Sequence, residues 1–168
     1  MHGTGMWLGC FVALSSGGTV VTTSKLGLDP HLLLSLVAEH RVTDLVIVGD
    51  AFARPILEAL NDARDRGQPY DLSSLKQIAS SGVMWSQETK TRLLEHHPGM
   101  MLMDAFSSSE ALGMGSSVSA AVATAETAKF ELSPDTIVID DLNRPLPAGS
   151  GEIGRLAVGG RQPVGYYK

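Results

Sequence analysis

The chain has 168 residues and a net charge of −5, and its 43% hydrophobic and 18% charged residues are ordinary for a single soluble domain. Lysine and arginine are scattered along the sequence, which argues against a nucleic-acid-binding protein, and no apolar run approaches the roughly 20 residues that span a membrane. The only cysteine, Cys10, excludes a disulfide within one chain and a cysteine-rich zinc site, so a cytoplasmic protein without a signal peptide is expected.

The first part of the chain alternates between strand and helix patterns. Residues 18–23 are short and β-branched, which predicts a strand. Asp29-Pro30 predicts the start of a helix, because it combines an N-cap residue with proline at the first helical position. Residues 44–48 then predict a buried strand, and an amphipathic helix follows over about residues 54–66.

The same alternation continues along the chain. Residues 75–79 predict a strand, and Ser86 caps a helix that reaches about His96. Residues 100–106 predict another buried strand, after which Ser109 opens a short helix. This succession of strands and helices predicts an α/β fold with a mainly parallel sheet flanked by helices.

The pattern changes near residue 125. Residues 136–140 and 152–158 are strand-like and are joined by a loop rich in proline and glycine. They predict a short antiparallel β element at the C-terminus. We therefore divide the chain into an α/β unit, residues 1–125, and a β-rich segment, residues 126–168.

Residues 104–110 form the most informative polar segment. They join a predicted strand to a predicted helix, where backbone N–H groups and hydroxyls can hold phosphate oxygens. Phe106 can stack on a base, and Glu110 can hold a divalent cation because hard cations prefer carboxylate oxygens. An ordinary polar loop with a serine N-cap explains the same residues, and spacing alone favours that simpler interpretation.

Two other segments follow predicted strands. Residues 80–83 end one strand, and ligands of open parallel sheets bind outside the carboxyl ends of the strands. A turn before Ser86 explains this segment equally well. Gly49 could border an acyl tunnel, whereas Asp50 most simply caps the next helix.

A histidine stands near the N-terminus in a glycine-rich segment. His2 is followed by the apolar residues Met6 and Trp7, an arrangement that could orient a carboxylate over a hydrophobic pocket. A surface loop that leads into a core helix explains it equally well. Taken alone, this segment favours the second interpretation.

Together, these segments resemble the adenylate-forming superfamily of acyl-CoA synthetases, luciferases and peptide-synthetase adenylation domains. Residues 104–110 resemble its aromatic-Gly-x-Thr-Glu motif, with Phe106 at the aromatic, Ser107 at the glycine, Ser109 at the threonine and Glu110 at the glutamate. Ser107 and Ser109 depart from the motif, although Ser109 keeps the hydroxyl. The resemblance rests on several short motifs that occur in the family's order over the whole chain.

The remaining motifs support the same resemblance. His2 is similar to the gating residue of an upstream motif, and residues 81–83 are similar to the Gly-Gly-Ala strand end that lies against adenine. Residues 47–55 resemble a stretch of actinobacterial fatty-acyl-CoA synthetases. Residues 151–154 and 165–167 resemble stretches that precede the family's ribose-binding aspartate.

The resemblance implies an ATP-dependent acyl-CoA synthetase, an acid–thiol ligase with ATP, Mg²⁺ and CoA as cofactors. A carboxylic acid, either a fatty acid or a steroid side chain, attacks the α-phosphate of ATP to give an acyl-adenylate and pyrophosphate, and a thioester with CoA follows. Charge that develops on the phosphate is stabilised by the metal and by hydrogen-bond donors.

The resemblance also implies roles for particular residues. The implied catalytic residues are His2, Ser109 and Glu110, with Glu110 as the Mg²⁺ ligand. The implied ATP- and AMP-binding residues are Ser81, Gly82, Val83, Asp104, Ala105, Phe106, Ser107, Ser108 and Ser109. Among these, Phe106 stacks on adenine and Asp104 accepts from its exocyclic amine. The implied acyl-binding residues are His2, Met6, Trp7, Gly49 and Asp50.

Several parts of such an enzyme are not found in the sequence. The phosphate loop with its lysine, the ribose-binding aspartate and the C-terminal domain with its catalytic lysine have no counterpart. The expectation is therefore an internal piece of the large N-terminal domain that does not turn over alone and that can self-associate through exposed apolar surface.

Two other function classes remain open. The chain could be a non-catalytic module that binds a nucleotide or an acyl group. An α/β esterase is suggested by His2 and the glycines after it, but the sequence contains no Gly-x-Ser-x-Gly elbow. A Rossmann dehydrogenase is not expected, because no Gly-x-Gly-x-x-Gly follows a predicted strand.

Overall fold

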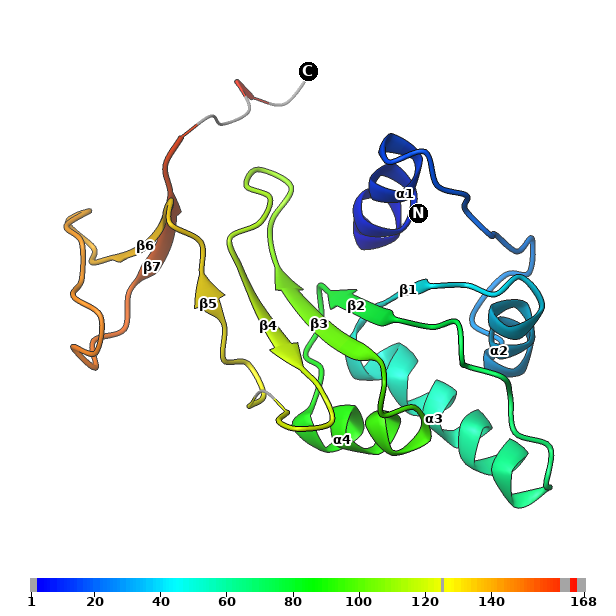
Figure 1. The fold of residues 1–168 in the computed structure, drawn as a ribbon. Coiled ribbons are helices and arrows are strands. Elements are labelled where there is room, and N and C mark those ends of the chain that lie inside the picture. Colours follow the sequence, from blue (N-terminus) through cyan, green and yellow to red (C-terminus); the bar gives the residue numbers. More distant parts are fainter. Residues whose placement is uncertain (1–2, 125, 161–163, 166–168) are drawn as a thin grey trace.

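The computed structural model describes residues 3–124, 126–160 and 164–165. A five-stranded sheet forms the centre of the molecule, and a two-stranded sheet follows it toward the C-terminus (Figure 1). The helical elements are η1 (Gly5–Phe11, a π-helix), α1 (Val12–Ser15), α2 (Pro30–Glu39), α3 (Gly49–Asp65) and α4 (Gln87–His96). The strands are β1 (Asp44–Ile47), β2 (Gln77–Ser81), β3 (Met101–Phe106), β4 (Gly115–Ser119), β5 (Glu131–Leu132), β6 (Thr136–Ile139) and β7 (Arg155–Val158).

The larger sheet has the strand order β1-β2-β3-β4-β5. Strands β1, β2 and β3 are parallel, whereas β4 is antiparallel to β3 and β5 is antiparallel to β4. Helices α3 and α4 cross between the parallel strands, and successive right-handed crossovers in one direction place both helices on one face. Figure 1 shows α3 and α4 on the same side of the sheet. The predicted α/β fold, with a mainly parallel sheet flanked by helices, is confirmed.

The hydrophobic core lies between this sheet and the helices. Alternate strand residues point toward α3 and α4, because successive side chains of a strand face opposite sides. The buried strand residues of the core include Leu45, Ile47, Ile78 and Leu102. The helices contribute one apolar face each, with Leu34, Val37, Ala53, Ile56, Leu57, Ala59, Leu60, Leu93 and Leu94.

Two predicted helix starts are confirmed by their caps. The carboxylate of Asp29 accepts a hydrogen bond from the backbone N–H of Leu32 at 3.1 Å, and Pro30 occupies the first position of α2. The hydroxyl of Ser86 accepts from the backbone N–H of Thr89 at 3.3 Å at the start of α4. Each cap satisfies a donor that the first helical turn leaves without a partner.

Two secondary-structure predictions in the N-terminal half of the chain are wrong. Residues 18–23 form no strand but an irregular connection between α1 and α2, because β-branched residues form a strand only when a neighbouring strand is available for pairing. Helix α3 begins at Gly49 and not near Arg54, so Val48 is its N-cap and Asp50 lies in the first turn. A carboxylate in the first turn interacts favourably with the helix dipole, so Asp50 stabilises a helix that begins at Gly49.

The predicted helix at Ser109 is also wrong. Residues 107–113 form a loop of bends and connect β3 to β4. The hydroxyl of Ser107 accepts from the N–H of Gly113 at 2.9 Å, and the hydroxyl of Ser108 accepts from the N–H of Ala111 at 3.1 Å. Such bonds from serine side chains to nearby backbone compete with helix formation, which explains the loop.

The C-terminal strands form the expected antiparallel pair. Residue Thr136 of β6 pairs with Val158 of β7. Strand β5, which the sequence did not predict, pairs with β4, so the larger sheet extends to Leu132. The change from one sheet to the other therefore lies after the boundary at residue 125, while the division into two domains stays a prediction. Among the described residues, no helix has both the length and the apolar character needed to cross a membrane.

Candidate functional site

The carboxyl ends of β1, β2 and β3 meet at one edge of the sheet. The parallel register pairs Ile47 with Ser80 and Ser81 with Ala105. Gly82 and Phe106, each one residue further along, therefore stand at neighbouring strand ends. This edge of a parallel sheet is the usual position for a ligand, and it brings together segments that are far apart in the sequence.

The loop between β3 and β4 begins and ends at the same edge. Phe106 pairs with Gly115 across the antiparallel strands, so residues 107–114 form a closed turn beyond it. The turn is held by the hydroxyls of Ser107 and Ser108, which bond to backbone N–H groups within the loop. Ser109 and Glu110 lie exposed in this loop, so a ligand can reach their side chains from the solvent.

A second aromatic residue packs on Phe106. The ring centroids of Phe106 and Phe130 are 5.6 Å apart, and the rings are tilted by 39°. Phe130 comes from the segment before β5, and sequence reasoning missed it because its pairing with Phe106 depends on two strands that the sequence did not predict. The contact limits the orientations of the Phe106 ring, since aromatic pairs favour tilted and offset geometries.

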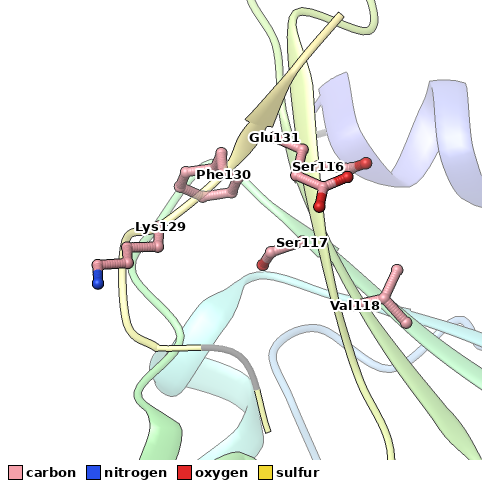
Figure 2. Close-up of a pocket in the computed structure, with 6 residues that line it drawn as sticks. All are labelled: Ser116, Ser117, Val118, Lys129, Phe130 and Glu131. Carbon is pink, nitrogen blue, oxygen red and sulfur yellow. The ribbon is translucent and has the colours of Figure 1, made fainter. Parts of the chain in front are cut away.

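A hollow of about 350 Å³ borders Phe130, one member of this aromatic pair (Figure 2). It lies between β4 and the segment that leads into β5, and its lining residues are Ser116, Ser117, Val118, Lys129, Phe130 and Glu131. None of the residues that the sequence assigned to a site lines it. The ammonium of Lys129 forms an ion pair with Glu126, so the charge of this lysine has a partner at the surface.

Asp104, two residues before Phe106, is buried and only 4% exposed. Its carboxylate lies 3.3 Å from the ammonium of Lys90 on α4, which is 1% exposed and lies 5.4 Å from the ring centroid of Trp85. Burial raises the pKa of Asp104 above its ordinary 3.8, and Lys90 offsets part of this effect. The carboxylate is therefore directed toward α4, and a contact with adenine stays a prediction.

The end of β2 and the segment that follows it are hydrogen-bonded to the start of α3. The hydroxyl of Ser80 accepts from the N–H of Gly49 at 2.9 Å, and the N–H of Asp50 donates to the carbonyl of Met84 at 3.0 Å. The carboxylate of Asp50 accepts from the N–H of Ser86 at 3.0 Å and from its hydroxyl at 3.1 Å. The predicted nucleotide segment and the predicted acyl segment are thus in direct contact.

The ionised form of Asp50 is favoured in this position. Burial raises the pKa of Asp50, but hydrogen bonds from the backbone and hydroxyl of Ser86 and from Arg54 outweigh that effect and hold the pKa below 3.8. The Asp50 side chain is 14% exposed. Its assignment to acyl binding, like that of Gly49, stays a prediction.

The N-terminal helix lies on the other face of the sheet, against β1. Gly9 faces Val46, and the Thr4 hydroxyl donates to the carbonyl of Ser81 at 3.4 Å, so η1 begins beside the end of β2. Met6 and Trp7 lie on η1, and Trp7 remains 42% exposed. His2 lies outside the described residues.

The described residues contain no ready-made metal cluster. No three His, Cys, Asp or Glu side chains within residues 3–124, 126–160 and 164–165 gather as ligands. A magnesium ion needs few protein ligands when a nucleotide supplies phosphate oxygens. The predicted role of Glu110 therefore remains compatible with its exposed position.

Comparison with known proteins assigns the family. The sequence model of the AMP-binding enzyme family matches residues 1–167. The chain belongs to this family. A 3-oxocholest-4-en-26-oate–CoA ligase of Rhodococcus rhodochrous is 37% identical over 176 residues, which cover 100% of the chain and 30% of the relative. A medium/long-chain-fatty-acid–CoA/3-oxocholest-4-en-26-oate–CoA ligase of Mycolicibacterium smegmatis is 36% identical over 94% of the chain and 28% of the relative.

Solved structures of similar shape have the same fold. The fused adenylation–PCP di-domain NpsA-ThdA from Klebsiella oxytoca has a TM-score of 0.67 at 16% identity, over 88% of this chain and 27% of that protein. The anthranilate CoA ligase AuaEII, solved in complex with anthranoyl-AMP, has a TM-score of 0.63 at 19% identity, over 83% of this chain and 26% of that protein. The chain thus spans about 30% of the length of the curated relatives that it matches.

Proposed function

We propose that this chain is a nucleotide-binding part of an ATP-dependent acyl-CoA ligase. In the whole enzyme, a carboxylate attacks the α-phosphate of ATP, pyrophosphate leaves, and CoA then displaces AMP from the acyl-adenylate. The observation that supports the proposal is the parallel register of β2 and β3, in which Gly82 and Phe106 follow neighbouring strands at the carboxyl edge of the sheet, where ligands of parallel sheets usually bind. The curated relatives, which are named as CoA ligases, support the same reaction class.

The proposed nucleotide site is built on two strand ends. Gly82 has no side chain and a φ of 93°, so the backbone of Ser81, Gly82 and Val83 offers a flat surface to adenine. Phe106 supplies the stacking ring. The polar groups of Asp104, Ala105, Ser107, Ser108 and Ser109 follow along the same strand end and loop.

The β3–β4 loop supplies the residue that would bind a metal ion. Glu110 is an exposed carboxylate in a segment whose hydroxyls and backbone N–H groups lie next to the proposed adenine position. Mg²⁺ bound with the nucleotide would offset the negative charge of the phosphates. We assign Glu110 as its protein ligand and Ser109 as a donor to the α-phosphate.

The acid substrate is proposed to be apolar, either a fatty acid or a steroid side chain, as the names of the relatives suggest. We assign His2, Met6, Trp7, Gly49 and Asp50 to the acyl-binding side of the site. The whole enzyme is proposed to be cytoplasmic. The exposed apolar side chains of η1 and α1, including Trp7, Phe11 and Leu14, also support self-association of the chain.

Titration with AMP tests the nucleotide site directly. We expect AMP to bind the chain, and we expect Phe106→Ala to weaken the affinity by about tenfold, because base–aromatic stacking contributes about 1–3 kcal/mol. Isothermal titration calorimetry of both proteins, at matched concentration and salt, measures this difference.

The control is Phe11→Ala, which removes a half-exposed ring from η1 and leaves β3 untouched. It should bind AMP as the parent chain does. A parent chain that shows no AMP binding at millimolar nucleotide, or a Phe106→Ala variant with unchanged affinity, would contradict the proposed function.

A further inference from the structure

The segment between β2 and α4 combines an exposed tip with buried anchors. Val83 and Met84 are exposed, whereas Ser80 and Trp85 on either side are fully buried. A short exposed segment between buried residues needs hydrogen bonds to hold one conformation. Those interactions come mainly from one neighbouring residue, Asp50.

Asp50 contacts this segment through both its backbone and its side chain. Its N–H donates to the Met84 carbonyl at 3.0 Å, and its Oδ1 accepts from the N–H and the hydroxyl of Ser86. The second oxygen, Oδ2, accepts from the exposed guanidinium of Arg54 at 3.2 Å. Both oxygens are thus engaged by groups of the protein, the backbone and hydroxyl of Ser86 and the side chain of Arg54.

The start of α3 and this segment also approach closely. An added Cβ at Gly49 would lie 2.5 Å from the carbonyl oxygens of both Val83 and Met84. The two backbones are therefore in van der Waals contact, with no side chain between them. A shift of Asp50 would consequently move residues 83–86, and with them the turn that begins at Gly82.

We propose that Asp50 is a positioning residue for nucleotide binding, whose carboxylate holds residues 82–86 in the conformation that accepts adenine. This inference rests on the proposed function, because it takes Gly82 as one wall of the nucleotide site. Without the carboxylate, the segment samples more conformations, and the nucleotide must order it on binding, which weakens affinity. Asp50 needs no contact with the ligand for this effect.

The test compares AMP affinity and local backbone protection in three proteins. For Asp50→Ala, we expect AMP affinity to fall by about tenfold and the Ser86 amide to exchange with solvent about tenfold faster, since a hydrogen bond to a charged group is lost. For Asp50→Asn, we expect partial rescue of both quantities, because the amide oxygen still accepts from Ser86. Calorimetry gives the affinity, and hydrogen exchange without nucleotide gives the protection.

Two control variants separate positioning from general destabilisation. Arg54→Ala removes the exposed partner of Asp50 but leaves both bonds to Ser86, so AMP affinity and Ser86 protection should stay unchanged. Val37→Ala lowers overall stability through the buried face of α2, a helix that carries none of residues 82–86. Compared well below the melting temperatures, Val37→Ala should keep the parent AMP affinity.

The outcomes distinguish this inference from the function on which it rests. Faster exchange at Ser86 with unchanged AMP affinity in Asp50→Ala overturns the positioning role, while the nucleotide site stands. Unchanged exchange in Asp50→Ala overturns the anchoring itself. Loss of affinity in Val37→Ala equal to that in Asp50→Ala overturns the positioning role, because general destabilisation would then explain both. A parent chain that fails to bind AMP defeats the proposed function, whatever the exchange at Ser86 shows.

Discussion

Lys90→Met should lower the free energy of unfolding by about 3–5 kcal/mol, because it leaves a buried carboxylate without its charged partner. Lys90 and Asp104 are 1% and 4% exposed, and their charged atoms lie 3.3 Å apart. Methionine keeps most of the volume of lysine, so the loss reports the missing charge and not a cavity. Urea unfolding followed by circular dichroism measures the change.

The deficit of Lys90→Met should depend on pH. The pKa of Asp104 is raised in the folded protein by burial, so the folded state holds its proton more tightly than the unfolded state. The variant also loses the ammonium that offset part of this effect. The deficit relative to the parent chain should therefore be smallest below the ordinary pKa of 3.8, where Asp104 is protonated in both states, and should grow as the pH rises through the raised value.

The double variant Lys90→Met/Asp104→Leu provides the control. It removes both charges, and buried ion pairs are often replaced by apolar residues at little cost. We expect it to recover most of the stability and to lose the part of the pH dependence that comes from Asp104. A single variant as stable as the parent chain at neutral pH would refute the buried pair as a source of stability.

Gly49→Ala should destabilise the chain by about 3 kcal/mol or more, through overpacking and a strained backbone together. The new Cβ would lie 2.5 Å from two backbone carbonyl oxygens, and the residue has a φ of 50°. Backbone atoms cannot rotate out of the way as a side chain can, so α3 or residues 83–84 must move. Thermal unfolding of the variant measures the loss.

Gly67→Ala is the matched comparison for this substitution. Gly67 has a φ of 69° just after α3, but nothing lies within 4 Å of its added Cβ. We expect a loss of about 1 kcal/mol, from the left-handed backbone alone. Equal losses at both glycines would show that the close approach at Gly49 does not matter.

Local signals explain why much of the fold could be predicted. Asp29 and Ser86 each combine a cap with an amphipathic run, and helices α2 and α4 begin where these caps indicate. The buried strands β1 and β3 are apolar and short, as a parallel sheet requires. Such signals lie within a few residues of one another and need no knowledge of the tertiary structure.

The errors arise where distant residues decide the outcome. Residues 18–23 have strand propensity, but no strand pairs with them in the described sheet. Strand β4 is rich in serine and depends on pairing with β3, so its composition gave no signal. Aspartate is a typical N-cap residue, yet the carboxylate of Asp50 bonds to Ser86, which is 36 residues away in the sequence.

The candidate site divides in the same way. The strand ends of Gly82 and Phe106 could be placed together from the rule for parallel sheets. Phe130 and Lys90 could not be assigned, because their contacts with Phe106 and Asp104 join parts of the chain whose register is known only from the structure. A bound nucleotide would thus contact the predicted residues Gly82 and Phe106, while Phe130 and Lys90 would hold Phe106 and Asp104 in place.

The order of the five strands has a consequence for how the chain acquires its shape. Each strand of the larger sheet pairs with its neighbour in the sequence, so no strand must insert between two that are already joined. Nearest-neighbour pairing keeps loop closures short, which favours rapid formation. During synthesis, the sheet can therefore grow by adding each new strand to its open edge as the ribosome releases it.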